Sequence, residues 1–175
     1  MAIWEDQGRI LVARRPPGGS WGARVVLDAS GKARSPQVET FGKARFLAAW
    51  AVVDHPNAGN GPTRVKVRAS RGAGWDPAVV VVSRVRGQFR DLDLAVAPSG
   101  AAVLGWEWLW HDWGGRLLVT HRRGPAAAWV TPRRWDGMWE FDALIGGSGL
   151  RAVAMHRQAG GRHRIQVIRG GLGRP

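Results

Sequence analysis

Three short segments of the chain share one layout, and their spacing constrains the fold more than any other feature. Each segment begins with Arg, passes through small residues and ends seven positions later on a Trp. The intervals from Trp21 to Trp75 and from Trp75 to Trp129 are both 54 residues. A constant period of this length indicates one supersecondary unit repeated along the chain.

Each unit is predicted to contain four short strands. Apolar runs that end at Trp50, Trp106 and Met155 predict the second strand, and tight polar turns before them predict a hairpin with the first. Runs rich in β-branched residues predict the third and fourth. The first strand is expected at 36–40, 92–96 and 141–145, and the second at 46–50, 102–106 and 151–155. The third strand is expected at 9–13, 64–68, 116–120 and 164–168, and the fourth at 24–27, 78–82 and 130–133.

Four antiparallel strands in about 50 residues are typical of a β-propeller blade. We therefore expect an all-β fold: one domain over residues 1–175, a partial or small β-propeller of about four blades, each an antiparallel four-stranded sheet. The repeat units are approximately 1–34, 35–89, 90–139 and 140–175.

The two terminal units are expected to hold three strands each. The first lacks the innermost strand and the last lacks the outermost, so they cannot complete one another. Three interpretations stay open: a propeller truncated at one or both ends, which we favour; a small ring with trimmed blades; or a half that forms a homo-oligomer through its open blade edges.

Charge and composition limit the function less than the fold. The formal net charge is +13, with 23 Arg against 3 Lys. This bias fits a polyanion or nucleic-acid partner, and equally the codon usage of a GC-rich genome. Absence of Cys excludes disulfides and thiolate metal sites. No apolar run is long enough for a membrane span, and the N-terminus does not read as a signal peptide.

The Gly-rich turn before each repeated Trp resembles the degenerate Asp-box of bacterial sialidase-like β-propeller repeats, including those of actinobacteria. The matching residues are Gly18, Ser20 and Trp21 in the first copy, Gly72 and Trp75 in the second, and Trp129 in the third. The Asp position itself holds Pro16, Ser70 and Gly124. The resemblance implies an extracellular protein if the N-terminus is truncated, and otherwise we expect a cytoplasmic one.

The sialidase-like resemblance also implies a Tyr nucleophile assisted by a carboxylate and an Arg cluster, yet the chain contains no Tyr. It also lacks phosphate-loop, dinucleotide and nucleophile-elbow motifs. His156 and His163 flank a Gly-Gly turn without a third ligand. We therefore expect no catalytic residue, no metal and no cofactor.

A run of alternating Trp residues is the preferred candidate binding site. Trp106 fills the core position of its repeat, whereas Trp108 and Trp110 are expected to extend past the strand end into a loop. There they would stack on sugar rings or bases, with Glu107, His111 and Asp112 bonding hydroxyls. The alternative is that these rings only pack in the core.

Two further sets of residues recur at equivalent repeat positions. Gln37, Asp93 and Asp142 each lie thirteen residues before the end of the apolar strand, and in a propeller they would line the central channel. Such oxygens bind a cation or sugar hydroxyls, unless they only bond backbone amides. Arg14, Arg68 and Arg122 would form a polyanion-binding face, unless they bond turn carbonyls or stack on Trp.

The sequence therefore predicts a non-catalytic β-propeller binding module with a carbohydrate ligand. Two alternatives remain: a fragment of a sialidase-like glycoside hydrolase, or a module that binds polyanions or nucleic acid through the repeated Arg positions. Polyanion binding weakens steeply with salt, whereas stacking on a neutral sugar does not.

Overall fold

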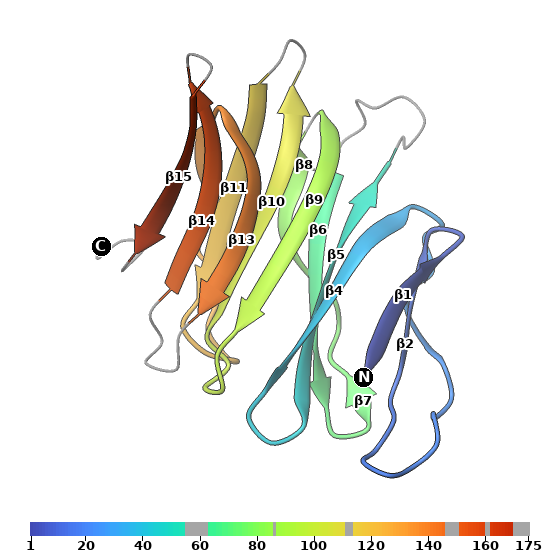
Figure 1. Ribbon diagram of the computed structural model, residues 1–175. Coiled ribbons are helices and arrows are strands. Elements are labelled where there is room, and N and C mark those ends of the chain that lie inside the picture. The colour runs from blue at the N-terminus through green and yellow to red at the C-terminus, as the bar shows by residue number, and fades with distance from the viewer. Residues whose placement is uncertain (55–62, 86, 111–113, 146–150, 160–161, 170–175) are drawn as a thin grey trace.

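A computed structural model shows a chain built from β-strands in four antiparallel sheets (Figure 1). It describes residues 1–54, 63–85, 87–110, 114–145, 151–159 and 162–169. Among these residues there is no helix, and therefore no helix long and apolar enough to cross a membrane. The expected all-β class with antiparallel sheets is confirmed.

The sheets follow one another in chain order. The first contains β1 (Ala2–Asp6), β2 (Arg9–Ala13) and β3 (Val25–Asp28). The second contains β4 (Ala33–Phe41), β5 (Arg45–Val53), β6 (Thr63–Arg71), β7 (Gly74–Trp75) and β8 (Val79–Val85), the last two both paired with β6. The third contains β9 (Gln88–Val96), β10 (Ala102–Trp110), β11 (Gly114–Arg122) and β12 (Arg133–Asp136). The fourth contains β13 (Met138–Ile145), β14 (Arg151–Ala159) and β15 (Arg162–Arg169).

Every range expected as a strand overlaps an observed strand, and the expected three strands in the first and last units are present. The weakest agreement is at 130–133, because β12 begins only at Arg133. Val130 instead donates its amide to the carbonyl of His121 at 2.9 Å and closes the preceding loop. Pro132 has no N–H to give to a strand ladder. These two features delay the strand.

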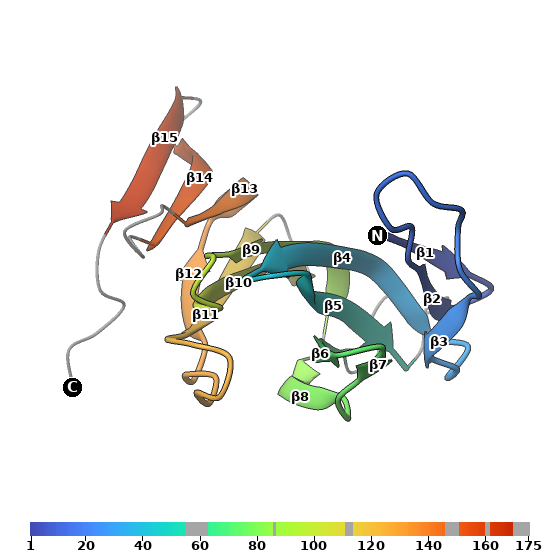
Figure 2. The ribbon, with the colours of Figure 1, turned by 90° about the horizontal axis from the view of Figure 1, so that it is seen from below.

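The four sheets stand face to face in an open row (Figures 1 and 2). Strand β9 contacts β4 on one side and β13 on the other, so the first strands of the second, third and fourth sheets are neighbours. The turn after β4 is tied to the turn after β9, where the Gly42 amide donates to the Pro98 carbonyl at 2.9 Å. The first and fourth sheets lie at opposite ends of the row, so the described residues do not close into a small ring.

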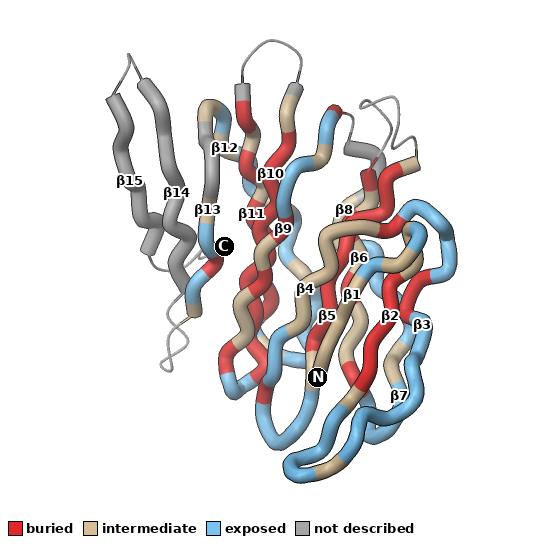
Figure 3. Tube along the Cα trace, turned by 45° about the vertical axis from the view of Figure 1, so that its right-hand side comes forward, coloured by how far each residue is buried: buried red, intermediate tan, exposed pale blue. Residues whose placement is uncertain are grey.

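Apolar residues form three clusters, one between each pair of successive sheets. Figure 3 shows along the chain which residues are buried. Strand β5 is central to this packing, because side chains alternate between its two faces and both faces are covered. Trp50 and Val52 pack toward the first sheet, and Leu47 packs toward the third. Trp106 occupies the space between the second and third sheets and is 1% exposed. The doubly buried strands explain the near-continuous apolar runs in the sequence.

One backbone hydrogen bond recurs beside each of the repeated Trp residues. The amide that follows the Trp donates to a carbonyl near the end of the preceding strand or at the start of the loop. These bonds join Gly22 to Arg14 at 2.8 Å, Asp76 to Ala69 at 2.9 Å and Val130 to His121 at 2.9 Å. The turns before Trp21, Trp75 and Trp129 are therefore closed by a similar hydrogen bond in all three copies.

Candidate functional site

The three polar positions predicted on the first strands occupy the same register in their sheets. Gln37 pairs with Ala49, Asp93 with Gly105 and Asp142 with Ala154. Each partner is the residue immediately before the aligned Trp50, Trp106 or Met155. Because β4, β9 and β13 are neighbours, the structure brings these positions together along one line of strands.

Asp93 holds the centre of this line. One of its carboxylate oxygens, Oδ2, accepts the Ala143 amide of β13 at 2.6 Å, and Oδ1 accepts its neighbour Leu94 at 3.0 Å. The first bond crosses from the third sheet to the fourth. The alternative that these acids bond backbone amides is thus realised at Asp93, where the amide belongs to a neighbouring strand. Asp142 is exposed in β13.

The only acid on β4, Glu39, was not among the residues predicted from the sequence. Partial burial raises its pKa, the charge of Asp93 raises it further, and a hydrogen bond from the Thr40 amide opposes both effects. The negative charge of Asp93 therefore reaches across from β9 to β4. Glu39 lies two residues after Gln37 on the same strand face, so period-two alternation was the available signal. We refer to Gln37, Glu39, Asp93 and Asp142 as the polar row.

The described part of the chain contains no group of three or more His, Asp or Glu side chains arranged to hold a metal ion. The members of the polar row present hydrogen-bonding groups. Ionised carboxylates accept hydrogen bonds, and the Gln amide both donates and accepts them.

The expected position of the Trp cluster is wrong. Strand β10 continues through Trp110, so neither Trp108 nor Trp110 begins a loop. Trp108 is only 9% exposed and pairs with Phe89 and Arg116. Its ring occupies space that a side chain at Gly87 would need, since a Cβ there would lie 1.6 Å from the Trp108 Nε1 atom. The Trp110 side chain, His111 and Asp112 lie outside the described residues, so their binding role stays a prediction.

The three repeated arginines all have contacts within the protein. Arg68 donates to the carbonyls of Asp76 at 2.6 Å, Leu27 at 3.1 Å and Trp75 at 3.4 Å. Arg14 donates to the Gly72 carbonyl at 2.8 Å and lies over Phe46, 4.8 Å from the ring centroid. The bonds to carbonyls are those expected if these arginines stabilise the turns instead of binding a ligand. Binding of a polyanion by Arg14 and Arg68 stays a prediction.

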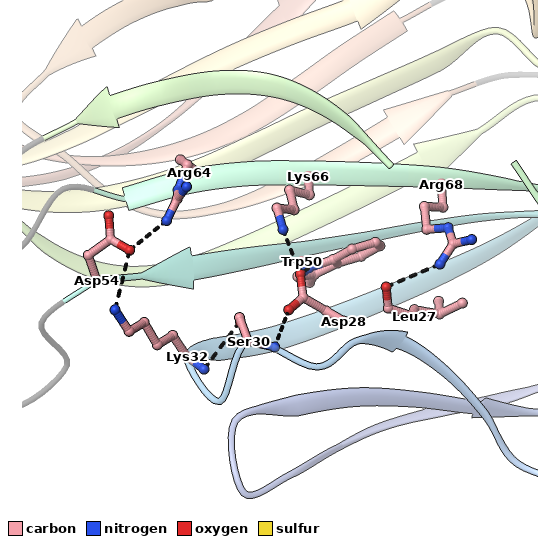
Figure 4. Close-up of polar contacts among 9 residues, drawn as sticks. All are labelled: Leu27, Asp28, Ser30, Lys32, Trp50, Asp54, Arg64, Lys66 and Arg68. Atoms are coloured by element: carbon pink, nitrogen blue, oxygen red, sulfur yellow. Dashed lines mark hydrogen bonds and ion pairs between the residues drawn. The ribbon is translucent and has the colours of Figure 1, made fainter. Parts of the chain in front are cut away.

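A buried polar network joins the first two sheets and was also missed in the sequence (Figure 4). The Asp28 carboxylate, at the end of β3, accepts hydrogen bonds from the Trp50 indole at 2.9 Å and from Lys66 at 2.8 Å. Burial raises the pKa of Asp28, but the bonds from Lys66, Ser30 and Trp50 outweigh it and hold the pKa at about 2. The sequence signal for this network was that Lys66 alternates with Val65 and Val67 on β6, which places the cation on the opposite strand face from the two valines.

Comparison with known proteins supports the fold. Neither a protein-family model nor a curated protein sequence matches the chain. Among solved structures, the Hadza microbial sialidase Hz136 is similar with a TM-score of 0.58 and 14% identity, over 91% of this chain and 38% of the sialidase. A mannose phosphorylase from Leishmania mexicana, in complex with phosphate ion, is similar with a TM-score of 0.45 and 16% identity, over 79% of this chain and 42% of the phosphorylase.

The arrangement of sheets is sialidase-like. At 14% identity the likeness concerns the fold alone, and the chain spans about two fifths of the sialidase.

Proposed function

We propose that this chain is part of a β-propeller that binds a neutral carbohydrate at the polar row without cleaving it. The observation that carries the proposal is the shared register of Gln37, Asp93 and Asp142 on three neighbouring strands. In a propeller the first strand of each blade lines the central channel. The polar row would then face a channel rather than an outer edge.

The propeller assignment rests on the face-to-face row of antiparallel sheets and on the sialidase likeness over 91% of the chain. In such an architecture each sheet covers the apolar face of the next. The three interior clusters follow this pattern, because each lies between two successive sheets.

The chemistry of the row favours a neutral ligand. Three of its four members are acids, and Asp93 already raises the pKa of Glu39. A further negative charge on a ligand would be repelled. Sugar hydroxyls donate to carboxylates and exchange hydrogen bonds with the Gln37 amide. The proposal is limited to binding, since the sequence holds no Tyr, the nucleophile that the sialidase-like resemblance implies.

Isothermal titration calorimetry with lactose and mannobiose tests this proposal. We expect weak binding, with a dissociation constant of about 1 mM, and little dependence on salt. Asp142→Asn removes an exposed acid of the row and should weaken binding about fivefold, because one hydrogen bond to a charged group is lost. Asp136→Asn, an exposed acid on β12 that pairs with Arg134, is the matched control and should bind as the parent does.

Three results would contradict the proposal. They are no heat with either sugar, equal affinities for the parent and Asp142→Asn, and release of free sugar from lactose, mannobiose or sialyllactose. The last result would favour the glycoside-hydrolase interpretation instead.

A further inference from the structure

Arg122 is a buried cation at the end of β11. The residue is 5% exposed, and its guanidinium carbon lies 5.4 Å from the centroid of the Trp129 ring and 6.0 Å from that of Phe41. Its Nη1 atom donates to the Pro125 carbonyl at 3.4 Å. The remaining nitrogens, Nε and Nη2, are shielded from solvent and have no hydrogen-bond partner.

This arrangement leaves the charge of Arg122 poorly compensated. No ion pair within the described residues includes Arg122. Aromatic rings stabilise a buried guanidinium in part, but they do not satisfy its N–H donors. Arg68 occupies the equivalent repeat position and shows the contrast, since three of its nitrogens donate to carbonyls. Arg14, the third residue at this repeat position, also has Nε and Nη2 atoms that are shielded and without a partner, but Arg14 as a whole is only partly buried, so Arg122 is the buried case.

A second cation lies close to Arg122. The Arg45 guanidinium is 4.7 Å from the centroid of the same Phe41 ring, and Arg45 is exposed. Burial lowers the pKa of Arg122, and the charge of Arg45 lowers it further. The turn between β9 and β10 packs tightly here, since a Cβ on Gly100 would lie 2.9 Å from Pro125 and 3.1 Å from Phe41. The positive charges of Arg45 and Arg122 therefore both lie beside the Phe41 ring, where the turn between β9 and β10 and the loop at Pro125 also pack.

We propose that Arg122, assisted by the charge of Arg45, binds a sulfate or phosphate group. The two unsatisfied nitrogens, Nε and Nη2, form one edge of the planar guanidinium, which presents two parallel N–H donors to two oxygens of one anion. The second positive charge favours a doubly charged oxyanion over a carboxylate. This site is distinct from the polar row and does not depend on the carbohydrate proposal.

Thermal unfolding of the full chain in sodium sulfate, compared with sodium chloride at equal ionic strength, tests the site. We expect sulfate to raise Tm in the parent, because an anion that binds only the folded state stabilises it. Titration calorimetry with inorganic sulfate then gives the affinity. Arg122→Met, which keeps an unbranched side chain without the charge, should weaken sulfate binding about tenfold or more.

Two further variants separate binding from folding. Arg45→Gln changes an exposed residue, so the chain should stay folded while sulfate binding weakens by a smaller factor. Arg123→Gln removes one positive charge from the adjacent exposed residue and is the matched control, which should bind sulfate as the parent does. Equal losses in Arg123→Gln and Arg45→Gln would overturn the proposal, because they would indicate only a net-charge effect.

The source of the anion is distinguished by a sulfated polysaccharide such as heparin. Tighter binding per sulfate group than for the free ion would assign the site to a group carried on a polymer, and equal binding would assign it to a free ion. Either result supports the site if Arg122→Met abolishes the binding that the parent shows. A Tm in sulfate equal to that in chloride, or an unchanged response in Arg122→Met, would overturn the proposal.

Discussion

The ammonium group of Lys66 lies 2.8 Å from the Asp28 carboxylate and joins the middle strand of the second sheet to the last strand of the first. The Asp28 side chain is only 4% exposed, and the same carboxylate oxygen also accepts the Trp50 indole N–H. The interface between the first two sheets therefore contains a buried ion pair, in addition to the hydrogen bonds from Arg68 to Leu27 and from Arg14 to Gly72. Buried pairs of this kind are most costly when one partner is removed.

Asp28→Asn is therefore expected to destabilise the fold strongly. The change leaves the Lys66 charge without its partner, and the expected loss is about 3 kcal/mol in the free energy of unfolding. Urea denaturation followed by Trp fluorescence measures it. Asp6→Asn is the control, because Asp6 pairs with Arg9 on the surface, and its loss should stay below about 1 kcal/mol. Equal losses in both variants would contradict the assigned role of Asp28.

The same carboxylate predicts a dependence of stability on pH. The pKa of Asp28 is about 2 in the folded protein against an ordinary value of 3.8. Its contribution is therefore complete above about pH 4 and declines as pH falls from 3.8 toward 2, by about 2 kcal/mol in total. Denaturation curves across this range should show the decline in the parent. Asp28→Asn should not show this decline in stability. An identical pH profile in both proteins would contradict the assignment of the decline to Asp28.

Gly105 is predicted to be required for contact between the third and fourth sheets. A Cβ at this position would lie 2.3 Å from Cε2 of Phe141, a ring atom on β13. Gly105→Ala should therefore displace the ring and cost about 1–3 kcal/mol, as overpacking does. Gly124→Ala is the control, because a Cβ there meets nothing within 4 Å. Chemical denaturation of the two variants side by side decides the matter, and no difference between them would refute the contact.

Ser70 is predicted to stabilise the start of β5. Its hydroxyl accepts the Phe46 amide at 2.8 Å, and the residue is 1% exposed. Ser70→Ala leaves that amide without a partner and should cost about 1–2 kcal/mol. The exposed Ser99, whose hydroxyl is 3.4 Å from the Ala101 amide, provides the comparison. Ser99→Ala should change the unfolding free energy by less than about 0.5 kcal/mol, and hydrogen exchange at Phe46 should accelerate only in Ser70→Ala.

Some features of the candidate sites could be predicted from the sequence, and others could not. The register of Gln37, Asp93 and Asp142 could be counted from the aligned strands, because strand pairing follows the same period as the sequence repeat. The burial of Trp108 could not be predicted, because it depends on how far β10 extends and on the space left by Gly87. The effect of Asp93 on the pKa of Glu39 could not be predicted either, because Asp93 lies on a neighbouring sheet.

Patterns in the sequence predicted where most strands lie and their order along the chain. These features follow from local patterns, namely apolar runs, Gly-rich turns and the 54-residue spacing of Trp residues. The polar groups that meet between sheets depend instead on how the sheets pack. Asp28 meets Trp50 and Lys66 across separations of 22 and 38 residues. The Nε and Nη2 donors of Arg122 are unmatched beside the rings of Phe41, on β4, and Trp129, in the loop after β11. Contacts between faces of different sheets depend on packing, which no periodicity along the chain encodes.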